Sequence, residues 1–507
     1  MVASLLRILG GSGIQDKRLC APVDTKAFKK VWRKAGLFTT QWQRIDFIDT
    51  PDFGRTRHAN ITLKGEFITR LCLVCNLPDI YTPQADAAVT AAAPQDDIYP
   101  SFGWTNSIGH ALVQEAAIEI DGSDYDYLNS QLLEVIDEFW TPYEKMKTTN
   151  ELIGRSESGF NSRSLGRSAA QPVREVFVPL PFWFSRGDAA AALPIDSLAN
   201  SQVRVRINFR ALNGLYYTES RAQNNTSTAD GTSLWPMLGS SFYKKTVVGD
   251  NIPGLLPPGA GTFVEPVAGV TMPTELHLGD CYLLAEYAYV DKYEAHTFRS
   301  SDIKIPIVQH IEIPVVSTKG ATDTIVPLRI GNPVKGLYWM AQREECASYN
   351  AHFLATRDFK DTGALAYGPW WPDCCGSVVL PGFSTRASEP FKNVSLVYEG
   401  KQIRYESETP AIFRSIVPSM ECIKAPWINK YYYTMRFGVG GSQYPISIVT
   451  GEANMDKIQR IDMRFGFNPI RGTADITVVP SYLVRIWAET YNVMRIYGGR
   501  AALMFAN

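Results

Sequence analysis

The sequence contains no long hydrophobic run. No stretch approaches about 18 uninterrupted apolar residues, the length that a membrane-crossing helix needs. The apolar start of the chain, Met1 to Leu9, is too short for the core and cleavage site of a secretory signal peptide. We therefore expect a soluble, unsecreted protein. Four Asn-x-Ser/Thr triplets, which would then be chance matches, begin at Asn60, Asn224, Asn225 and Asn393.

The chain has almost no net charge. Fifty basic residues stand against fifty-one acidic ones, so the whole chain cannot act as a polycation that binds nucleic acid. The exception is residues 1–36, which carry eight Lys or Arg against Asp16 and Asp24. We interpret this stretch as a basic N-terminal arm. Two readings stay open: a solvated helix face, or a contact with an acidic partner or an anionic lipid surface.

Cysteines are sparse. The eight of them lack the regular spacing of a disulfide scaffold, so reduced thiols are the expected state. Cys72 and Cys75 form a CxxC, but they lie in the apolar run ITRLCLVCNLP, which is typical of a strand. Positions i and i+3 of a strand point to opposite faces, so we expect no metal there. Cys374 and Cys375 follow GPWWPD, and we interpret each as a small buried apolar residue.

The common catalytic and cofactor motifs are missing. The chain has no GxSxG, HExxH, P-loop or EF-hand loop, and Gly438, Gly440 and Gly441 lack the strand-before, helix-after context of a phosphate loop. Asp121, Asp124 and Asp126 resemble a turn more than a calcium loop. The six histidines, which show no metal-ligand spacing and are interpreted as structural, are His58, His110, His277, His296, His310 and His352. We therefore expect no enzyme activity, no cofactor and no metal.

Strand periodicity is what the sequence does contain. In VRVRINFR, apolar Val203 to Phe209 alternate with polar residues, which predicts a half-buried strand. Similar patterns occur around Ile61 and Leu63, and over Val173–Phe184, Ile303–Ile313, Ile325–Ile330 and Ile476–Trp487. Apolar spacing near 3.6 predicts a helix over Tyr127–Lys147. Strands and helices do not alternate regularly, so an antiparallel sandwich is favoured over a parallel sheet.

The chain length and a central stretch rich in glycine and proline predict two domains. A chain of 507 residues exceeds what one core usually serves, and 45% apolar with 20% charged residues is ordinary for a folded protein. Residues 213–278 are dense in Gly, Pro, Ser and Asn, a composition that disfavours regular structure. We predict an arm at 1–36, a first domain at 37–212, a linker and long loop at 213–278 and a second domain at 279–507.

Several blocks, taken in order, resemble one protein family. They are TKAFKKVWRKAGLF near the start, FGRTRHANITLKGEFITRLCLVCNLP, WTNSIGHALVQEAAIEIDGSDYDYL, VPLPFWFSRGDAAAALPIDSLANSQVRVRINFR, LLAEYAYVDKYEAHTF, NPVKGLYWMAQ and the end WAETYNVMRIYGGRAALMFAN. Together they span most of the chain and resemble the double jelly-roll major capsid proteins of nucleocytoplasmic large DNA viruses. The sequence departs from the family pattern at Ala21-Pro22 and at YPISIVTGEANMD.

The resemblance implies a fold and a function. It implies an all-β chain of two consecutive jelly rolls, with short helices in loops, that assembles as a homotrimer with a pseudo-hexameric outline and tiles an icosahedral shell. The implied partners are copies of itself, minor capsid and penton proteins, and an internal viral membrane through the arm, with no direct nucleic-acid contact. The implied location is the outer capsid shell of the virion, with assembly in the host cytoplasm.

Two alternatives stay open beside this reading. A minor or penton capsid protein would share the fold, and so would a carbohydrate-binding or carbohydrate-cleaving jelly roll. A carbohydrate-cleaving enzyme would need a pair of carboxylates placed in a cleft. The sequence alone does not assign Asp96, Asp97 and Glu119 to such a pair. Candidate aromatic residues for contacts between subunits or for anchoring loops, each equally compatible with core packing, are Trp104, Trp235, Trp370 and Trp371.

Overall fold

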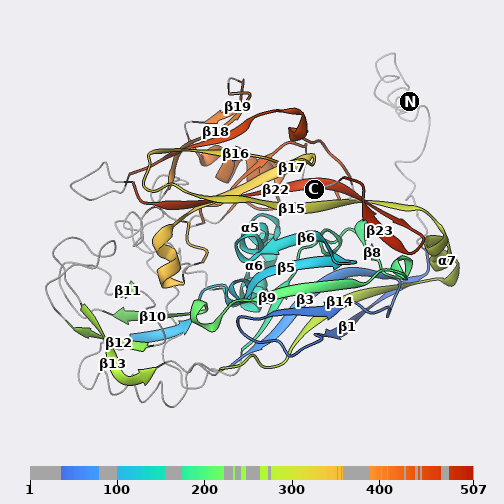
Figure 1. The fold of residues 1–507 in the computed structure, drawn as a ribbon, viewed down its shortest axis with the longest axis horizontal. Coiled ribbons are helices and arrows are strands. Elements are labelled where there is room, and N and C mark those ends of the chain that lie inside the picture. The colour runs from blue at the N-terminus through green and yellow to red at the C-terminus, as the bar shows by residue number, and fades with distance from the viewer. Residues whose placement is uncertain are drawn as a thin grey trace, which may run out of the picture.

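Strands dominate the chain and form two β-sandwiches, one above the other in Figure 1. The computed structural model describes residues 36–78, 100–155, 174–221, 232–234, 241–246, 263–271, 276–350, 352–355, 357, 389–400, 402–407, 409–426, 430–439, 444–445, 448–469 and 479–505. The arm at 1–36 therefore lies outside the described residues, apart from Gly36.

The first sandwich consists of two antiparallel sheets. One has the order β1-β14-β3-β7, with β8 also paired to β3, and the other has the order β2-β9-β5-β6. The strands are β1 (Phe38–Asp46), β2 (Thr56–Asn60), β3 (Phe67–Leu77), β5 (Val113–Ile120), β6 (Ser123–Asn129), β7 (Arg174–Pro179), β8 (Leu193–Pro194), β9 (Val203–Phe209) and β14 (Cys281–Val290).

The second sandwich repeats this construction. Its sheets have the orders β15-β22-β17-β20, with β23 paired to β22, and β16-β21-β18-β19. The strands are β15 (Ile303–Ser317), β16 (Asp323–Leu328), β17 (Val334–Arg343), β18 (Phe391–Tyr398), β19 (Gln402–Ser407), β20 (Tyr433–Arg436), β21 (Ile461–Phe467), β22 (Tyr482–Tyr497) and β23 (Arg500–Leu503). A five-stranded and a four-stranded sheet facing each other, twice in one chain, fit the predicted all-β pair of jelly rolls.

The stretch 213–278 is not irregular throughout. It holds strands of two small antiparallel sheets, with the orders β11-β10-β4 and β12-β13, at the side of the first sandwich (Figure 1). The strands are β4 (Pro100–Trp104), β10 (Tyr216–Arg221), β11 (Thr232–Leu234), β12 (Ser241–Thr246) and β13 (Phe263–Thr271). Gly and Pro density predicted a linker without regular structure, and that part of the prediction is wrong because β12 and β13 pair with each other.

Strand β14 corrects the predicted start of the second domain at 279. It lies between β1 and β3, with Phe38 opposite Val290 and Cys75 opposite Cys281, so it belongs to the first sandwich. Its burial alternates, and Leu283, Ala285 and Tyr287 fill the first core. The chain passes to the second sandwich after this strand, through helix α7 (Lys292–Ser300). The remaining domain boundaries stay predictions.

The helix predicted over Tyr127–Lys147 is two helices that follow a strand. Leu128 lies in β6, α5 runs Ser130–Trp140, and α6 runs Tyr143–Ile153 after Pro142. The Asn129 side chain accepts a bond from the Leu132 amide and fixes the start of α5. The other short helices are α4 (Ile108–Leu112), α10 (Val417–Glu421), the π-helix η8 (Ile412–Ile416) and the 3₁₀ turns η3 (Trp183–Ser185), η4 (Ala189–Ala191), η5 (Asp196–Leu198), η6 (Leu212–Gly214), η7 (Glu344–Tyr349) and η9 (Met455–Lys457). Within the described ranges, no helix is long and apolar enough to cross a membrane.

Most predicted strands are confirmed, with shifted ends. Val203–Phe209 alternates buried and half-buried residues as β9, and Cys72 and Cys75 lie in β3. β2 ends at Asn60, and Leu63 is exposed, so the pattern around Ile61 and Leu63 overran the strand. β7 ends at Pro179 because a proline has no N–H for the ladder, which leaves Leu180–Phe184 outside it.

Of the other predicted strands, Ile303–Ile313 lies in β15 and most of Ile325–Ile330 in β16. Pro327 is tolerated there because β16 is an edge strand. The predicted strand Ile476–Trp487 is confirmed from Tyr482 onward. Residues 476–478 lie outside the described part, and residues 479–481 precede the strand.

Gly109 packs where three elements of the first sandwich meet. A Cβ at this position would lie 2.9 Å from Val178 Cγ2 and 3.1 Å from Ile153 Cα. Ile153 offers backbone atoms, which cannot move as a flexible side chain could. Glycine thus lets α4 approach the end of α6 and strand β7, which explains the glycine in the segment NSIGHA.

Replacing Gly109 by alanine should destabilise the protein. Overpacking against backbone typically costs about 1 to 3 kcal/mol, and urea unfolding of Gly109→Ala should show a loss of that size. Gly331→Ala is the matched control, since no heavy atom lies within 4 Å of its added Cβ. Equal unfolding midpoints for the two variants would contradict the close packing at Gly109.

Candidate functional site at the interface of the two sandwiches

The edges of two sheets meet where the sandwiches touch. Strand β6 of the first lies against β15 of the second, beneath β22 in Figure 1. They belong to different sheets, and side chains join them: Gln309 Nε2 donates to Tyr125 O at 2.5 Å, and the His310 amide donates to Asp126 Oδ1 at 2.9 Å. The His310 ring also contacts Asp126 Oδ1 through Nδ1, at 3.0 Å. The two sandwiches are therefore linked by polar contacts.

A buried carboxylate, Glu489 of β22, gathers cations from both sandwiches. Arg436 Nη1 of β20 lies 2.5 Å from Oε2, and Lys335 Nζ of β17 lies 3.8 Å from Oε1. Arg186, which follows η3 of the first sandwich, places Nη1 2.7 Å from Oε1. Tyr338 also donates its hydroxyl to Oε2, at 3.2 Å. Arg186 is thus the ion-pair partner that crosses the interface.

The Glu489 carboxylate is charged in spite of complete burial. Burial by itself raises the pKa of a carboxyl, but Arg436, Lys335 and Arg186 outweigh it and hold the pKa of Glu489 well below its usual range. Burial lowers the pKa of the Lys335 ammonium to about 8, against the attraction of Glu489. Arg186 continues the network, since its Nη2 lies 2.7 Å from His310 Nε2. This chain runs on through His310 to Asp126.

A second buried carboxylate, Glu134, lies in helix α5. Its Oε2 contacts Arg155 Nη2 at 2.6 Å and His110 Nδ1 of α4 at 2.8 Å. Arg155 Nη1 also pairs with Asp137, at 2.5 Å. Lys430, which precedes β20 in the second sandwich, places Nζ 3.0 Å from Glu134 Oε1. Burial opposes the charge of Glu134, but Arg155 and Lys430 overcome it and lower its pKa well below the ordinary value.

A loop contact completes the interface beside η6. His352 Nε2 lies 2.6 Å from Gly214 O, and Asn350 Nδ2 donates to Asn213 O at 2.7 Å. Thr105 of the first sandwich donates its hydroxyl to Asn350 O at 2.8 Å. Burial, with the nearby charge of Arg210, lowers the pKa of His352 to about 4. The ring is therefore neutral near pH 7 and donates through Nε2.

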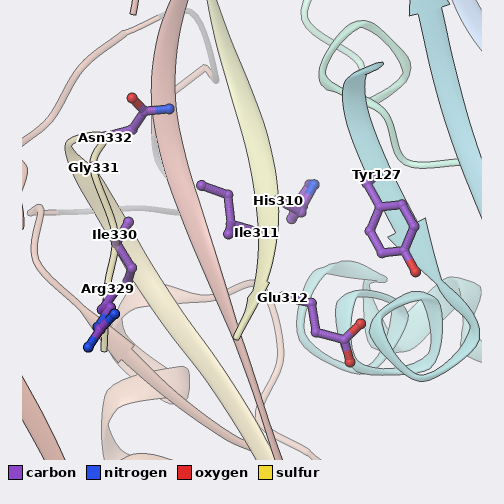
Figure 2. A pocket seen from close by; sticks show the side chains of 8 residues that line it. All are labelled: Tyr127, His310, Ile311, Glu312, Arg329, Ile330, Gly331 and Asn332. Carbon is purple, nitrogen blue, oxygen red and sulfur yellow. The ribbon is translucent and has the colours of Figure 1, made fainter. Parts of the chain in front are cut away.

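A cavity of about 510 Å³ opens beside these contacts. In Figure 2, His310 and Glu312 point from β15 toward Tyr127 of β6, while Ile311 points to the opposite side. Glu312 bonds Asn129 Nδ2 at 2.8 Å and Arg485 Nη1 at 3.2 Å, and burial raises its pKa. The lining residues are Tyr127, His310, Ile311, Glu312, Arg329, Ile330, Gly331 and Asn332. Among them Glu312 is the one carboxylate, so this lining does not supply the pair that glycoside cleavage uses.

The arrangement is suited to holding two bodies together. Buried opposite charges meet at hydrogen-bond distance, and breaking one such pair strands a charge in a medium of low polarity. Among the residues that the structure describes, no group of three or more His, Cys, Asp or Glu is placed to hold a metal ion. The geometry thus supports a mechanical role for this interface.

The six histidines were predicted to be structural, and the contacts of four agree. His110 and His310 bond buried carboxylates, His352 bonds a backbone carbonyl, and His277 Nδ1 lies 2.8 Å from Asp52 Oδ2. Each of these contacts is with another side chain or the backbone of the chain, as expected of side chains that fix a local conformation.

The acidic residues singled out in the sequence do not form one group in the structure. Asp121 and Gly122 adopt positive φ and form the predicted turn between β5 and β6. Arg206 spans Glu119 at 2.6 Å and Asp124 at 2.8 Å, so Glu119 is an ion-pair partner. Asp96 and Asp97 lie outside the described residues.

Most of the aromatic candidates lie outside the residues that the structure describes. Trp104 packs against the core and stacks on Phe53, with ring centroids 6.3 Å apart, which favours loop anchoring within one chain. Trp235, Trp370 and Trp371 lie outside the described residues, as do Cys374 and Cys375.

Sequence reasoning missed the residues of the interface. Glu489 was available as a signal, because it is the one carboxylate in VRIWAETYNVM, a segment rich in large apolar residues, and a buried strand tolerates a carboxylate only when it is paired. Its partners could not be found this way, since Arg186 is remote in sequence and belongs to the other sandwich.

Replacing Glu489 by glutamine should strongly destabilise the protein. The variant leaves Arg436, Lys335 and Arg186 buried without their counter-charge, and such a loss typically costs about 3 to 5 kcal/mol. Urea unfolding measures the difference. Asp302→Asn is the control, because it breaks an ion pair with Arg495 of similar length, 2.8 Å, at the surface and should change little. Equal effects of both variants would contradict the role assigned to Glu489.

Lowering the pH should destabilise the folded protein through His352. Its pKa is about 4 when folded against 6.5 ordinarily, so below pH 6.5 the unfolded chain binds a proton that the folded chain does not. The free energy of unfolding should therefore fall as the pH drops from 6.5 to 4, by at most about 1.4 kcal/mol per pH unit. His352→Gln should show a shallower decline in urea unfolding measured across this range.

The control for that experiment is His296→Gln, a substitution on the exposed side of helix α7. It should reproduce the decline of the natural sequence. A slope for His352→Gln identical to that of the natural sequence would show that the ring carries its proton in the folded state.

Comparisons with known proteins find capsid proteins that are similar to this chain. A family model described as the N-terminus of the major capsid protein matches residues 26–241. The chain is 26% identical over 211 residues to a probable capsid protein 4 of Acanthamoeba polyphaga mimivirus, covering 40% of this chain and 37% of the relative. It is 24% identical over 352 residues to the major capsid protein of Frog virus 3, covering 69% and 63%. The match thus spans about a third to two thirds of these relatives' length.

Solved structures share the fold across nearly the whole chain. A quasi-atomic model of the PBCV-1 virus capsid aligns with a TM-score of 0.62 at 16% identity, covering 95% of this chain and 100% of that one. The Faustovirus major capsid protein aligns with a TM-score of 0.60 at 12% identity, covering 97% and 96%. The predicted double jelly-roll fold is confirmed, and this chain is similar in sequence to major capsid proteins of large DNA viruses.

Proposed function

We propose that this chain is the structural subunit of an icosahedral shell and assembles as a homotrimer with a pseudo-hexameric outline. Each chain carries two sandwiches of the same construction, so three chains present six similar bodies around one axis. A three-fold ring of this kind can occupy a six-fold position in a lattice. Closed cyclic symmetry suits such repeated contacts between identical chains.

The observation that carries this proposal is the buried ion-pair interface. A subunit that tiles a surface must keep a fixed angle between its two jelly rolls, because any hinge would spread through the lattice. Glu489 with Arg186, and Glu134 with Lys430, tie the rolls at two separate points.

Exposed apolar side chains would form the contacts between copies of the chain. Leu37 and Phe38 are 83% and 62% exposed at the start of edge strand β1, and Tyr293 of α7 is 84% exposed. Phe38 pairs with Val290, so α7 begins beside them. Permanent interfaces commonly bury about 2,000 Å² or more and are rich in such side chains.

The proposal includes partners and a place. The subunit would contact neighbouring capsomers, minor capsid proteins and penton proteins in the outer shell of the virion, after assembly in the host cytoplasm. The basic arm at 1–36 would face inward, toward an acidic partner or an anionic membrane, with eight cations and no role in binding nucleic acid. No catalytic activity is proposed.

Light scattering on the purified full chain tests the assembly. We expect a particle of three times the 56.5 kDa chain mass, about 170 kDa, that does not dissociate at micromolar concentration. A stable monomer would overturn the trimer. Copy number in purified virions then separates a major subunit from a minor or penton protein, because the major subunit must outnumber the others.

A further inference from the structure

Two cysteines face each other across a pair of strands. In the register of β3 and β14, Cys75 is directly opposite Cys281. Directly opposed residues of an antiparallel pair point to the same face, and both side chains lie in the first core, 0% and 6% exposed. The sequence gives no hint of this pairing, because the two residues lie on either side of the stretch 213–278.

The backbone bonding at this point brings the pair close. Leu71 of β3 turns its N–H to Ser185 Oγ and its C=O to the Leu180 amide, so both point away from β14. Backbone direction alternates along a strand, so residues 73 and 75 also point away from β14. Asn76 agrees, since its amide bonds Asp280 O on the β14 side.

Cys75 and Cys281 therefore occupy a site without backbone bonds between the two residues. At such sites the Cα atoms of opposed residues lie about 4.5 Å apart, closer than at hydrogen-bonded sites. Disulfides span Cα distances of about 4.4 to 6.8 Å. The two strands thus hold these residues within the range that a disulfide requires, with no shift of register.

The side chains meet as the backbone suggests. The Cys75 thiol is in hydrogen-bond contact with the Cys281 thiol, and burial raises the pKa of Cys75 well above its ordinary value. Cys72 provides a contrast in the same strand. It sits opposite Leu284, and as an i−3 neighbour it points to the other face of the sheet, so it has no cysteine to meet.

We propose that Cys75 and Cys281 form a disulfide that joins β3 to β14 once the chain meets an oxidising environment. The oxidant is a low-molecular-weight disulfide. One thiolate attacks it and releases one thiol, and the second cysteine then displaces the other half. Overall, two protein thiols lose two protons and two electrons, one S–S bond forms in the protein, and the oxidant becomes two thiols.

Burial sets the route of this reaction. A thiol with a raised pKa inside a core is a poor nucleophile, so exchange must occur while β14 is still docking or during a local opening of the sheet. The finished bond would close a loop of about 200 residues, and large loops give disulfides a large effect on the unfolded chain. It would hold in place β14, the strand that follows the stretch 213–278.

The experiment uses the full chain refolded from urea with glutathione disulfide at pH 8, then alkylated, digested and analysed by mass spectrometry. We expect one cross-linked peptide pair containing Cys75 and Cys281, with a mass 2 Da below the sum of its reduced peptides. Cys72 should be alkylated. Recovery of Cys75 and Cys281 both alkylated, or joined to other cysteines, would overturn the proposal.

Thermal unfolding provides a second readout. The melting temperature of the oxidised chain should drop by several degrees when dithiothreitol is added, since the bond restrains the unfolded state. Cys72→Ser should keep this drop, while Cys75→Ser and Cys281→Ala should lose it. A drop that persists in both Cys75→Ser and Cys281→Ala would assign the reductant effect elsewhere and contradict the proposed bond.

Discussion

The buried carboxylate of Glu489 is the constraint on which the arrangement of the two jelly rolls depends. Its charge is tolerable only while Arg436 and Lys335 of its own roll and Arg186 of the other surround it. Any rotation of one roll against the other would withdraw Arg186 and leave charge uncompensated. Apolar packing alone would allow sliding, whereas paired charges at hydrogen-bond distance define one relative position. Glu134 with Lys430 adds a second such point, which removes the remaining freedom to pivot.

Local patterns predicted local structure well. Alternation over Val203–Phe209 appears as β9, since a half-buried strand needs one apolar face. The helix over Tyr127–Lys147 was only partly right, because Leu128, Leu132 and Leu133 satisfy a helical spacing even though the first of them belongs to β6. Pro142 was the signal for the break between α5 and α6, since a proline is favoured at a helix start and not inside one.

Long-range structure was predictable only through the family resemblance. The pairing of β14 with β1 and β3 depends on residues more than 200 positions apart, and no local period encodes a partner. The interface has the same limit. Glu489 in an apolar strand signals a buried, paired carboxylate, but the identity of Arg186 as its partner follows from how two separate sandwiches dock. The domain boundary failed for this reason too, because composition marked the loop while pairing decided which side β14 joined.

The place of β14 also bears on how the protein is made. An interior strand of the first sheet is supplied by residues 281–290, after the whole stretch that leads away from that sandwich and back. A ribosome must therefore translate well past the middle of the chain before β1 gains a neighbour in its sheet. Until then β1 and β3 present unpaired edges that could recruit foreign strands. The nascent first jelly roll thus exposes unpaired strand edges during synthesis, and chaperones would bind it in this period.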